Sequence, residues 1–176
     1  SAPGGFAAAA AVPNTSNATF SGCTFVNHAG HSVLRIFGNT FFDVNLTNCT
    51  FADNDTSRVI DAVPEAGVHI SDCTFNANSG MVIQNIGEIM EITDCQFTEN
   101  LGTVIDSGGA PGMLNLTVTG CTFTDNVANN FPQQGGAVSI SSGGASLGQC
   151  VFTGNQATLG GAVFCTGGTI TLSACT

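Results

Sequence analysis

The sequence predicts an all-β fold, a right-handed parallel β-helix (solenoid) of about seven three-strand coils. Two observations predict it: a Cys-x-Phe motif that recurs every 22 to 29 residues, and an alternation of apolar and polar residues around each copy. A period in the twenties is typical of stacked coils, because each repeat buries its apolar face only against its neighbours. Parallel crossovers are almost always right-handed, which predicts the direction of winding. The motif cysteines are Cys23, Cys49, Cys73, Cys95, Cys121, Cys150 and Cys175, the last without its Phe.

The first strand of each coil precedes the cysteine, and the second strand follows it. Apolar residues stand three and five positions before the cysteine, as Leu46 and Val44 do before Cys49, and this period of two predicts one buried face. The residue directly before the cysteine is mostly small or polar, which predicts a corner. Beyond the corner, Cys and Phe alternate with outward residues. We therefore expect a stack of inward phenylalanines: Phe25, Phe51, Phe75, Phe97, Phe123 and Phe152.

An asparagine stands three residues after each phenylalanine, except in the first coil, where His28 takes the place. Side-chain amides repeated at one corner of stacked coils bond to one another and to the turn backbone, so we expect a ladder. Its members are Asn54, Asn78, Asn100, Asn126 and Asn155. A third strand follows, opened by Gly or Ser, and residues 7–11 are expected to form a strand rather than a helix. The outward column of the third strand is Arg35, Asp61, Gln84, Asp106, Ser139 and Phe164.

Composition limits the partners and the domain organisation. The 176 residues fit one β-helix domain, residues 1–176, which we expect to be a segment of a longer protein because it opens directly into a coil. Charged residues make up 8% of the chain, lysine is absent, and the net charge is −10. This balance excludes nucleic acid and anionic membranes as partners. Membrane insertion is not expected, because no apolar run approaches the ~20 residues of a membrane span.

Eight cysteines and six Asn-x-Ser/Thr sequons predict an extracellular or cell-surface location. The strand register places Asn17, Asn45 and Asn115 on outward positions of first strands. We expect these three to carry glycans, together with Asn14. Asn54 belongs to the ladder and is expected to remain unmodified.

The cysteine column allows two interpretations. Stacked Cα atoms ~4.8 Å apart lie within the range that a disulfide spans, so the pairs 23–49, 73–95, 121–150 and 165–175 would use every cysteine. The alternative is a ladder of buried free thiols that pack as small apolar side chains. A catalytic thiol is not expected, because no cation or helix terminus is placed to lower its pKa. The disulfide candidates are Cys23, Cys49, Cys73, Cys95, Cys121, Cys150, Cys165 and Cys175.

The repeats resemble those of polymorphic outer-membrane proteins and of related large secreted β-helix proteins. The resemblance rests on Gly-Gly-Ala-Val at 135–138 and 160–163 and on Phe-x-x-Asn, for example at 123–126 and 152–155. The motif covers about six of the seven coils, with Phe-x-x-Asn intact in five of them and Gly-Gly intact only in the last two. The resemblance implies an adhesive, surface-displayed right-handed β-helix. It specifies the fold more closely than the function.

A carbohydrate-active β-helix enzyme, either a lyase or a glycosidase, is the alternative function. Asp61 and Asp106 lie two coils apart in the outward column, with their Cα atoms ~9.6 Å apart. That is near the separation of the carboxylates in an inverting glycosidase. However, the chain has no Trp or Tyr to stack on a sugar, and Arg35 is placed to pair with Asp61 in a surface ion pair. No catalytic residue is therefore expected.

Neither a metal ion nor another cofactor is expected. Asp53, Glu99 and Asp125 share the position before the ladder asparagine, but Ala77 interrupts their column. We interpret it as a solvated acidic edge. His28 and His31 have no Cys or carboxylate partner at a suitable offset.

An ice- or glycan-binding module is the third alternative, because a flat strand face with regular Thr can order water. The outward column of the first strand is irregular: Thr19, Asn45, His69, Glu91, Thr117, Ser146 and Thr171. The favoured function is therefore a non-enzymatic structural or adhesive component of an extracellular filament or fibre. Its expected partners are further copies, neighbouring subunits, and glycans.

Overall fold

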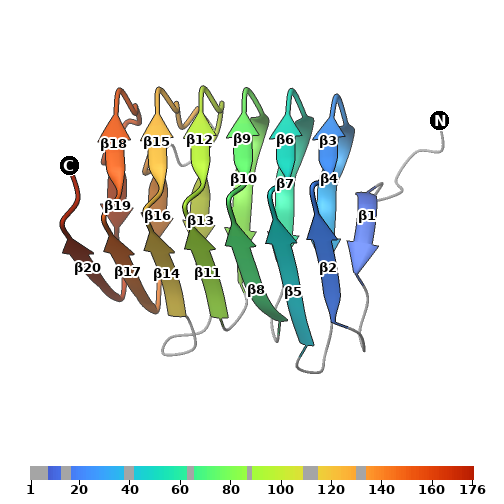
Figure 1. The fold of residues 1–176 in the computed structure, drawn as a ribbon. Coiled ribbons are helices and arrows are strands. Elements are labelled where there is room, and N and C mark those ends of the chain that lie inside the picture. Colours follow the sequence, from blue (N-terminus) through green and yellow to red (C-terminus); the bar gives the residue numbers. More distant parts are fainter. Residues whose placement is uncertain are drawn as a thin grey trace.

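A computed structural model describes residues 8–12, 17–37, 42–62, 66–86, 89–108, 115–129 and 134–176. Within these ranges the regular elements are twenty β-strands in three sheets, and every strand pairing between them is parallel. The strands form a right-handed parallel β-helix, as predicted. In Figure 1 the chain climbs along the front, descends along the back and advances from right to left, which is a right-handed winding.

Each sheet collects one strand from every coil. Sheet B contains β2 (Ala18–Ser21), β5 (Phe42–Thr47), β8 (Ala66–Ser71), β11 (Ile89–Thr93), β14 (Asn115–Thr119), β17 (Gly144–Gly148) and β20 (Thr169–Ser173). Sheet C contains β3 (Thr24–Val26), β6 (Thr50–Ala52), β9 (Thr74–Asn76), β12 (Gln96–Thr98), β15 (Thr122–Thr124) and β18 (Val151–Thr153). Sheet A contains β1 (Ala8–Val12), β4 (Ala29–Ile36), β7 (Asp55–Ala62), β10 (Ser79–Asn85), β13 (Ile105–Ser107), β16 (Val138–Ile140) and β19 (Val163–Cys165).

The described residues make six complete coils, from β2–β4 to β17–β19, with β1 before them and β20 after them. The expectation of about seven coils came from counting seven motif cysteines, and the seventh, Cys175, follows β20. The predicted strand at residues 7–11 is confirmed as β1, which pairs with β4 in sheet A. Ala7 lies outside the described residues.

Two corners of each coil depend on a single residue with a left-handed backbone. One stands directly before the cysteine, as in Asn48 (φ 54°) and Asp72 (φ 54°). The other stands directly before the ladder asparagine, as in Asp53 (φ 52°) and Ala77 (φ 51°). Asn and Asp accept this conformation at little cost, and Gly accepts it freely, which explains the residue types that recur there. The corners fix the register, because each coil turns after the same number of strand residues.

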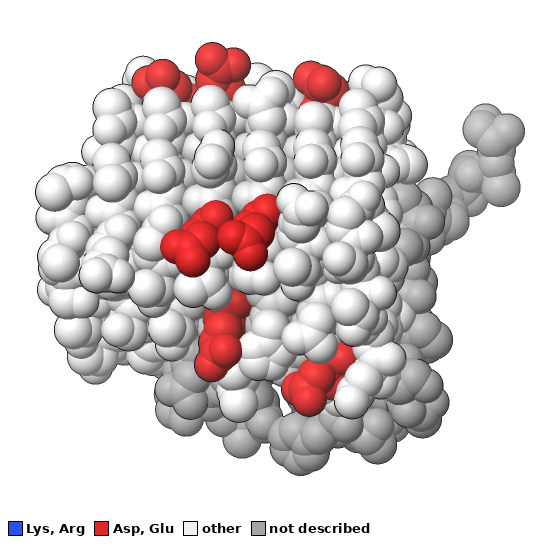
Figure 2. All heavy atoms as spheres, in the orientation of Figure 1, with Lys and Arg blue, Asp and Glu red and all other residues white. Residues whose placement is uncertain are grey.

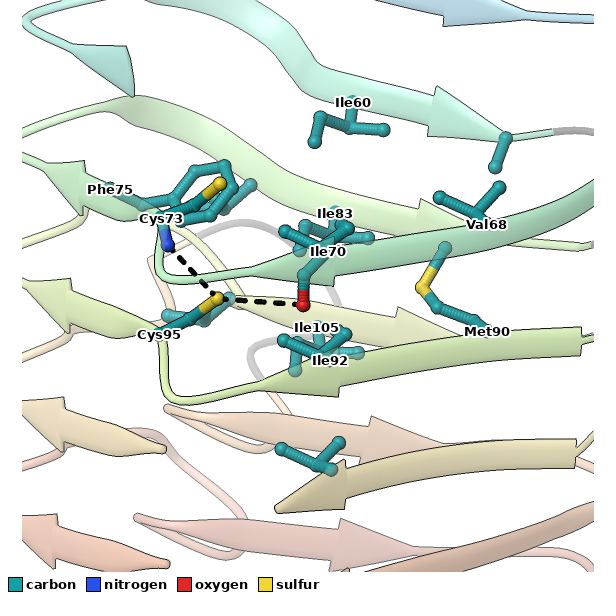
Figure 3. Close-up of a cluster of buried hydrophobic side chains, with 14 of the residues drawn as sticks. Ile60, Val68, Ile70, Cys73, Phe75, Ile83, Met90, Ile92, Cys95 and Ile105 are labelled. Carbon is teal, nitrogen blue, oxygen red and sulfur yellow. Dashed lines mark hydrogen bonds between the residues drawn. The ribbon is translucent and has the colours of Figure 1, made fainter. Parts of the chain in front are cut away.

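The core is built from columns of identical or similar side chains (Figure 3). In sheet C the rings of consecutive phenylalanines from Phe25 to Phe152 stack with centroids 4.8 to 5.0 Å apart and planes within 10° of parallel. In the inward column of sheet B, Val44, Val68 and Met90 are fully buried. Near-parallel rings show that consecutive coils hardly twist against one another, so sheet C is flat. The predicted phenylalanine stack is confirmed.

The asparagine ladder is also confirmed. Asn78 shows its geometry: its Nδ2 donates to the Oδ1 of Asn100 (3.0 Å) and to the carbonyl of Phe51 (2.9 Å). Its Oδ1 accepts from the Nδ2 of Asn54 (2.8 Å) and from the backbone N–H of Asn54 (3.2 Å). The same pattern continues to Asn155. These bonds satisfy amides that are otherwise buried in the core, where an unpaired polar group is costly.

Candidate functional site

All eight cysteines are free thiols in this structure, which corrects the proposed disulfide pairing. Five of them, at positions 49, 73, 95, 121 and 150, are buried, while Cys165 is exposed. Each buried thiol faces the same way as the one below it. The backbone N–H of Cys73 approaches the Sγ of Cys95 at 3.4 Å, and that Sγ donates to the carbonyl of Ile70 (Figure 3). A disulfide needs side chains that turn toward one another, whereas stacked parallel side chains remain side by side.

The thiol ladder is not arranged for chemistry. A side-chain hydrogen bond with Cys95 lowers the pKa of the Cys73 thiol to about 7 and lowers that of Cys121, but both side chains are buried, at 1% and 0% exposed, so no substrate reaches them. Burial raises the pKa of the Cys150 thiol to about 11 and also raises that of Cys49. A thiol with a raised pKa is protonated at neutral pH and is a poor nucleophile. The alternative interpretation, an apolar ladder of free thiols, therefore describes the structure.

A polar cluster lies on the outer face of sheet A, and it contains both arginines of the chain. The predicted outward column is confirmed, because Arg35 pairs with Asp61 in register and Asp61 pairs with Gln84. The Arg35 Nε lies 3.4 Å from Asp61 Oδ2, and the Arg58 Nε lies 3.8 Å from Asp61 Oδ1. Arg35 also lies over the ring of Phe37, 5.8 Å from its centroid. Two guanidiniums therefore share one carboxylate.

The ion pair was expected at the surface, and that expectation is wrong: the Asp61 side chain is 4% exposed. The reason is a departure from strand alternation. Val59 and Ile60 are consecutive and both fully buried, so the outward residues on either side of them, Arg58 and Asp61, approach one another. The arginine side chains then lie against the carboxylate. A buried carboxylate requires such partners, because removing an isolated charge from water is very costly.

His31 extends the cluster. Its Nε2 lies 3.2 Å from an Nη of Arg58, and its Nδ1 lies 2.8 Å from Ser32 Oγ. A guanidinium only donates hydrogen bonds, so Nε2 is the acceptor and the ring proton sits on Nδ1. The partners of His31 in the structure include Arg58 and Ser32.

The second carboxylate of the column, Asp106, lies two coils beyond Asp61 and pairs in register with Gln84 and Ser139. Burial raises the pKa of the Asp106 carboxyl, and hydrogen bonds from Ser139 and Gln84 oppose the rise. Asp61 and Asp106 therefore occupy different environments: one is paired with two cations, and the other is desolvated beside neutral donors.

A groove opens beside this cluster, at the start of the sheet A strands. It encloses about 580 Å³, and the residues that line it belong to five successive coils. They are Gly30, Asp55, Thr56, Ser57, Ser79, Gly80, Leu101 and Asn129. Gly30 directly precedes His31, and Ser57 directly precedes Arg58, so the groove and the polar cluster adjoin. Sequence reasoning missed the groove; its signal was the difference in length between the third strands of neighbouring coils.

The acidic column behaves as interpreted. Asp53, Glu99 and Asp125 occupy left-handed corner positions and are exposed. Figure 2 shows acidic side chains along the upper edge of the face that it draws. No group of three or more His, Cys, Asp or Glu among the described residues is placed to hold a metal ion. A second row, Asp72 and Asp94, lies at the corner between sheets B and C.

The outward faces of sheets B and C, which meet at the corner that carries Asp72 and Asp94, differ. The outward column of sheet B is mixed, as its sequence indicated, and His69 Nδ1 lies 3.0 Å from Glu91 Oε2 there. Sequence reasoning missed the outward face of sheet C, which is flat and carries no charge. Seven of its twelve outward positions are threonine: Thr24, Thr50, Thr74, Thr98, Thr122, Thr124 and Thr153.

The sequons fall where the register placed them, as far as they are described. Asn17 is exposed, and its Oδ1 accepts the backbone N–H of Asp43 at 2.9 Å. Asn45 points outward and is half-buried, whereas Asn54 is 1% exposed within the ladder. Asn115 is the first residue of β14, and its side chain lies outside the described residues, as does all of Asn14.

A family model described as a right-handed beta helix region matches residues 5–176. The chain belongs to this family. Membership agrees with the three parallel sheets and with the direction of winding. Comparisons with curated proteins and with solved structures gave no match. No helix in the described part of the chain is long and apolar enough to cross a membrane. The right-handed beta helix region defines an architecture that carries different functions, so the function must be argued from surfaces and sites.

Proposed function

We propose that the chain is a non-enzymatic structural or adhesive component of an extracellular or cell-surface assembly, such as a filament or fibre. The observation that carries this proposal is the outward face of sheet C, which is flat and uncharged and has threonine at seven of its twelve outward positions. The phenylalanine rings behind this face stack with planes within 10° of parallel, so the face repeats from coil to coil with little twist. A flat, repetitive strand face of this kind is suited to packing against a second flat surface.

The sides of the solenoid suit lateral contact. Figure 2 shows no cation on the face of sheets B and C, and the outward positions of sheet C are uncharged. The outward side chains of two such sheet C faces carry no charge and do not repel one another, and the acidic side chains stand at the corners on either side of them. The resemblance to polymorphic outer-membrane protein repeats supports the same function, since those repeats form adhesive surface-displayed rods.

Association through sheet C is testable with one charged variant. Thr98→Asp places a carboxylate on the outward face of sheet C, and Thr117→Asp places one on the exposed outward face of sheet B as the matched control. At micromolar concentration we expect light scattering and negative-stain microscopy to show association of the wild type and of Thr117→Asp, and its loss in Thr98→Asp. A monomeric, folded wild type would contradict the proposal.

The extracellular location is tested through the sequons. Expression in a eukaryotic secretory host, followed by glycopeptide mass spectrometry, should show glycans at Asn17, Asn45, Asn115 and Asn14. Asn54 should stay unmodified, because its amide nitrogen donates to Asn78 Oδ1 (2.8 Å) and to the carbonyl of Phe25 (3.1 Å). Occupancy at Asn54 with empty outward sites would refute the register.

A carbohydrate-active enzyme is the second candidate, favoured by the different environments of Asp61 and Asp106. One ionised carboxylate and one carboxyl with a raised pKa are the pair that acid–base cleavage of a glycosidic bond requires. Against it, Asp61 is nearly inaccessible and already neutralised by two arginines. Incubation with polysaccharides decides the matter: release of oligosaccharides by the wild type and its loss in Asp106→Asn would support the enzyme.

A further inference from the structure

A histidine on the outer face of sheet B lies between two carboxylates, one at each ring nitrogen. His69 Nδ1 lies 3.0 Å from Glu91 Oε2, and His69 Nε2 lies 3.9 Å from Asp43 Oδ1. We propose that His69 and Asp43 bind a divalent transition-metal ion of the zinc class, while Glu91 orients the imidazole. The site lies on sheet B, so the inference is independent of the association through sheet C proposed above.

The strand register brings the three side chains together. His69 in β8 and Glu91 in β11 are register partners, so their outward side chains stand side by side. Asp43 in β5 has Gly67 as its register partner, two residues before His69, and therefore reaches His69 across the diagonal. The side chains of His69, Asp43 and Glu91 are 37%, 59% and 56% exposed. A hydrated ion can therefore approach them directly from solvent.

The two distances give the carboxylates different roles. At 3.0 Å, Glu91 accepts a hydrogen bond from a protonated Nδ1, which assigns the lone pair of His69 to Nε2, on the side of Asp43. Zinc lies ~2.0–2.2 Å from nitrogen and oxygen ligands, so two ligands of one tetrahedral ion stand ~3.4 Å apart. The 3.9 Å between Nε2 and Asp43 Oδ1 is too long for a hydrogen bond. A small rotation of the exposed carboxylate brings the two atoms to the separation that zinc requires.

Gly67 leaves open the space in which the ion would lie. A Cβ there would overlap Asp43 Oδ1 and would stand 3.6 Å from His69 Nε2. The backbone of Gly67 has no left-handed φ, so the strand itself does not require glycine at this position. What the glycine contributes is the absence of a side chain between the two ligand atoms.

The ligand atoms select the class of ion. Imidazole nitrogen suits zinc, copper and nickel, whereas calcium and magnesium take oxygen ligands. A metal-bound histidine usually donates its other ring N–H to a carboxylate, as His69 does to Glu91. Glu91 thus serves the far side of the ring, and only two protein ligands face the ion. Water would complete the coordination, so we expect binding in the micromolar range rather than the tighter binding of a four-ligand structural site.

Titration calorimetry of the chain with zinc chloride tests the site. The protein is prepared without glycans, because Asn45 is the register partner of His69. We expect one zinc ion to bind at this site and His69→Gln to abolish that binding. Glu91→Gln should weaken it about tenfold, as loss of an outer carboxylate does at other histidine sites, and Asp43→Asn should weaken it more. Gly67→Val should abolish binding by filling the space, although every ligand remains.

Controls separate this site from other groups in the chain. Cys165→Ser in every titrated protein removes the exposed thiol as a competing ligand. His28→Gln removes an imidazole from the corner between β3 and β4 and should leave zinc binding unchanged, and excess calcium should not displace zinc. Circular dichroism confirms that each variant is folded.

The nitrogen resonances of the His69 ring provide a second measurement. Zinc should bind Nε2 and leave the proton on Nδ1, and this pattern should be absent from Gly67→Val. The proposal is overturned if zinc does not bind, if it binds equally well to His69→Gln or Gly67→Val, or if it coordinates Nδ1.

Discussion

Replacing Phe97 by alanine tests how the core is held together. The ring is fully buried and stacks on both sides, with centroids 4.8 Å from those of Phe75 and Phe123. Truncating a buried phenylalanine costs about 3–5 kcal/mol, because apolar contacts are lost and a cavity is left. Phe152 is half-buried and stacks on one ring only, so Phe152→Ala should cost roughly half as much. Phe37→Ala, which removes a 40% exposed ring, should cost below ~1 kcal/mol.

Urea unfolding followed by far-ultraviolet circular dichroism measures these free energies, and an unchanged m-value licenses the comparison between variants. The chain has no Trp or Tyr, so backbone signal is the appropriate probe. The decisive result is the order of the losses in unfolding free energy, which should be largest for Phe97→Ala, intermediate for Phe152→Ala and smallest for Phe37→Ala. A cost below ~1 kcal/mol for Phe97→Ala, or one equal to that of Phe37→Ala, would refute the stacked core.

Four further outcomes follow from the ladders and corners. Under native conditions an alkylating reagent should modify Cys165 readily and the five buried cysteines only after unfolding; intact mass showing no reactive thiol after denaturation would instead reveal disulfides. Asn100→Ala should cost about 3 kcal/mol in urea unfolding, because it leaves buried partners unpaired, against under ~0.5 for the outward Asn76→Ala. Ala77→Asn should raise the unfolding free energy by ~1 kcal/mol, since Ala77 has φ 51°; an unchanged or lower value would refute this. The folded-state pKa of Asp106 is raised, so the unfolding free energy should fall as pH rises from the unfolded pKa through the folded one, and Asp106→Asn should remove this slope; a slope that persists in the variant belongs to another group.

The ladders were predictable because the cysteine fixes a register in which each offset has one direction. The phenylalanines, the ladder asparagines and the column from Arg35 to Phe164 all lie where their offsets placed them. The burial of Asp61 was not predicted, because the alternation of apolar and polar residues predicts to which side of the sheet a side chain points but not how deeply it is buried. A usable signal existed: two adjacent apolar residues recur in the third strand, as in Val59-Ile60 and Val82-Ile83, and strict alternation does not allow that.

The sequence did not predict the groove, and the disulfide pairing predicted for the cysteines was wrong, for other reasons. The groove depends on one additional residue in β7 relative to β10, visible in the sequence as six positions from Asn54 to Ile60 against five from Asn78 to Ile83. In the sequence alone, a difference of one residue cannot be distinguished from variation in loop length, because the pairing of the strands is not known. For the thiols, the spacing of the Cα atoms suits a disulfide, but a disulfide also requires side chains that point toward one another, and the sequence does not specify that direction.

The asparagine ladder has a consequence for how such a protein changes length during evolution. Every rung presents the same acceptor to one neighbour and the same donor to the other, so no rung is specific to its place in the series. Deleting residues 73–94 would join Asp72 to Cys95 and set Asn100 beside Asn54, with phenylalanine again above phenylalanine. Recombination between repeats can therefore lengthen or shorten the rod one coil at a time without inventing a new interface. The length of the rod is then a trait that unequal crossing-over can adjust, while the chemistry of its surface stays constant.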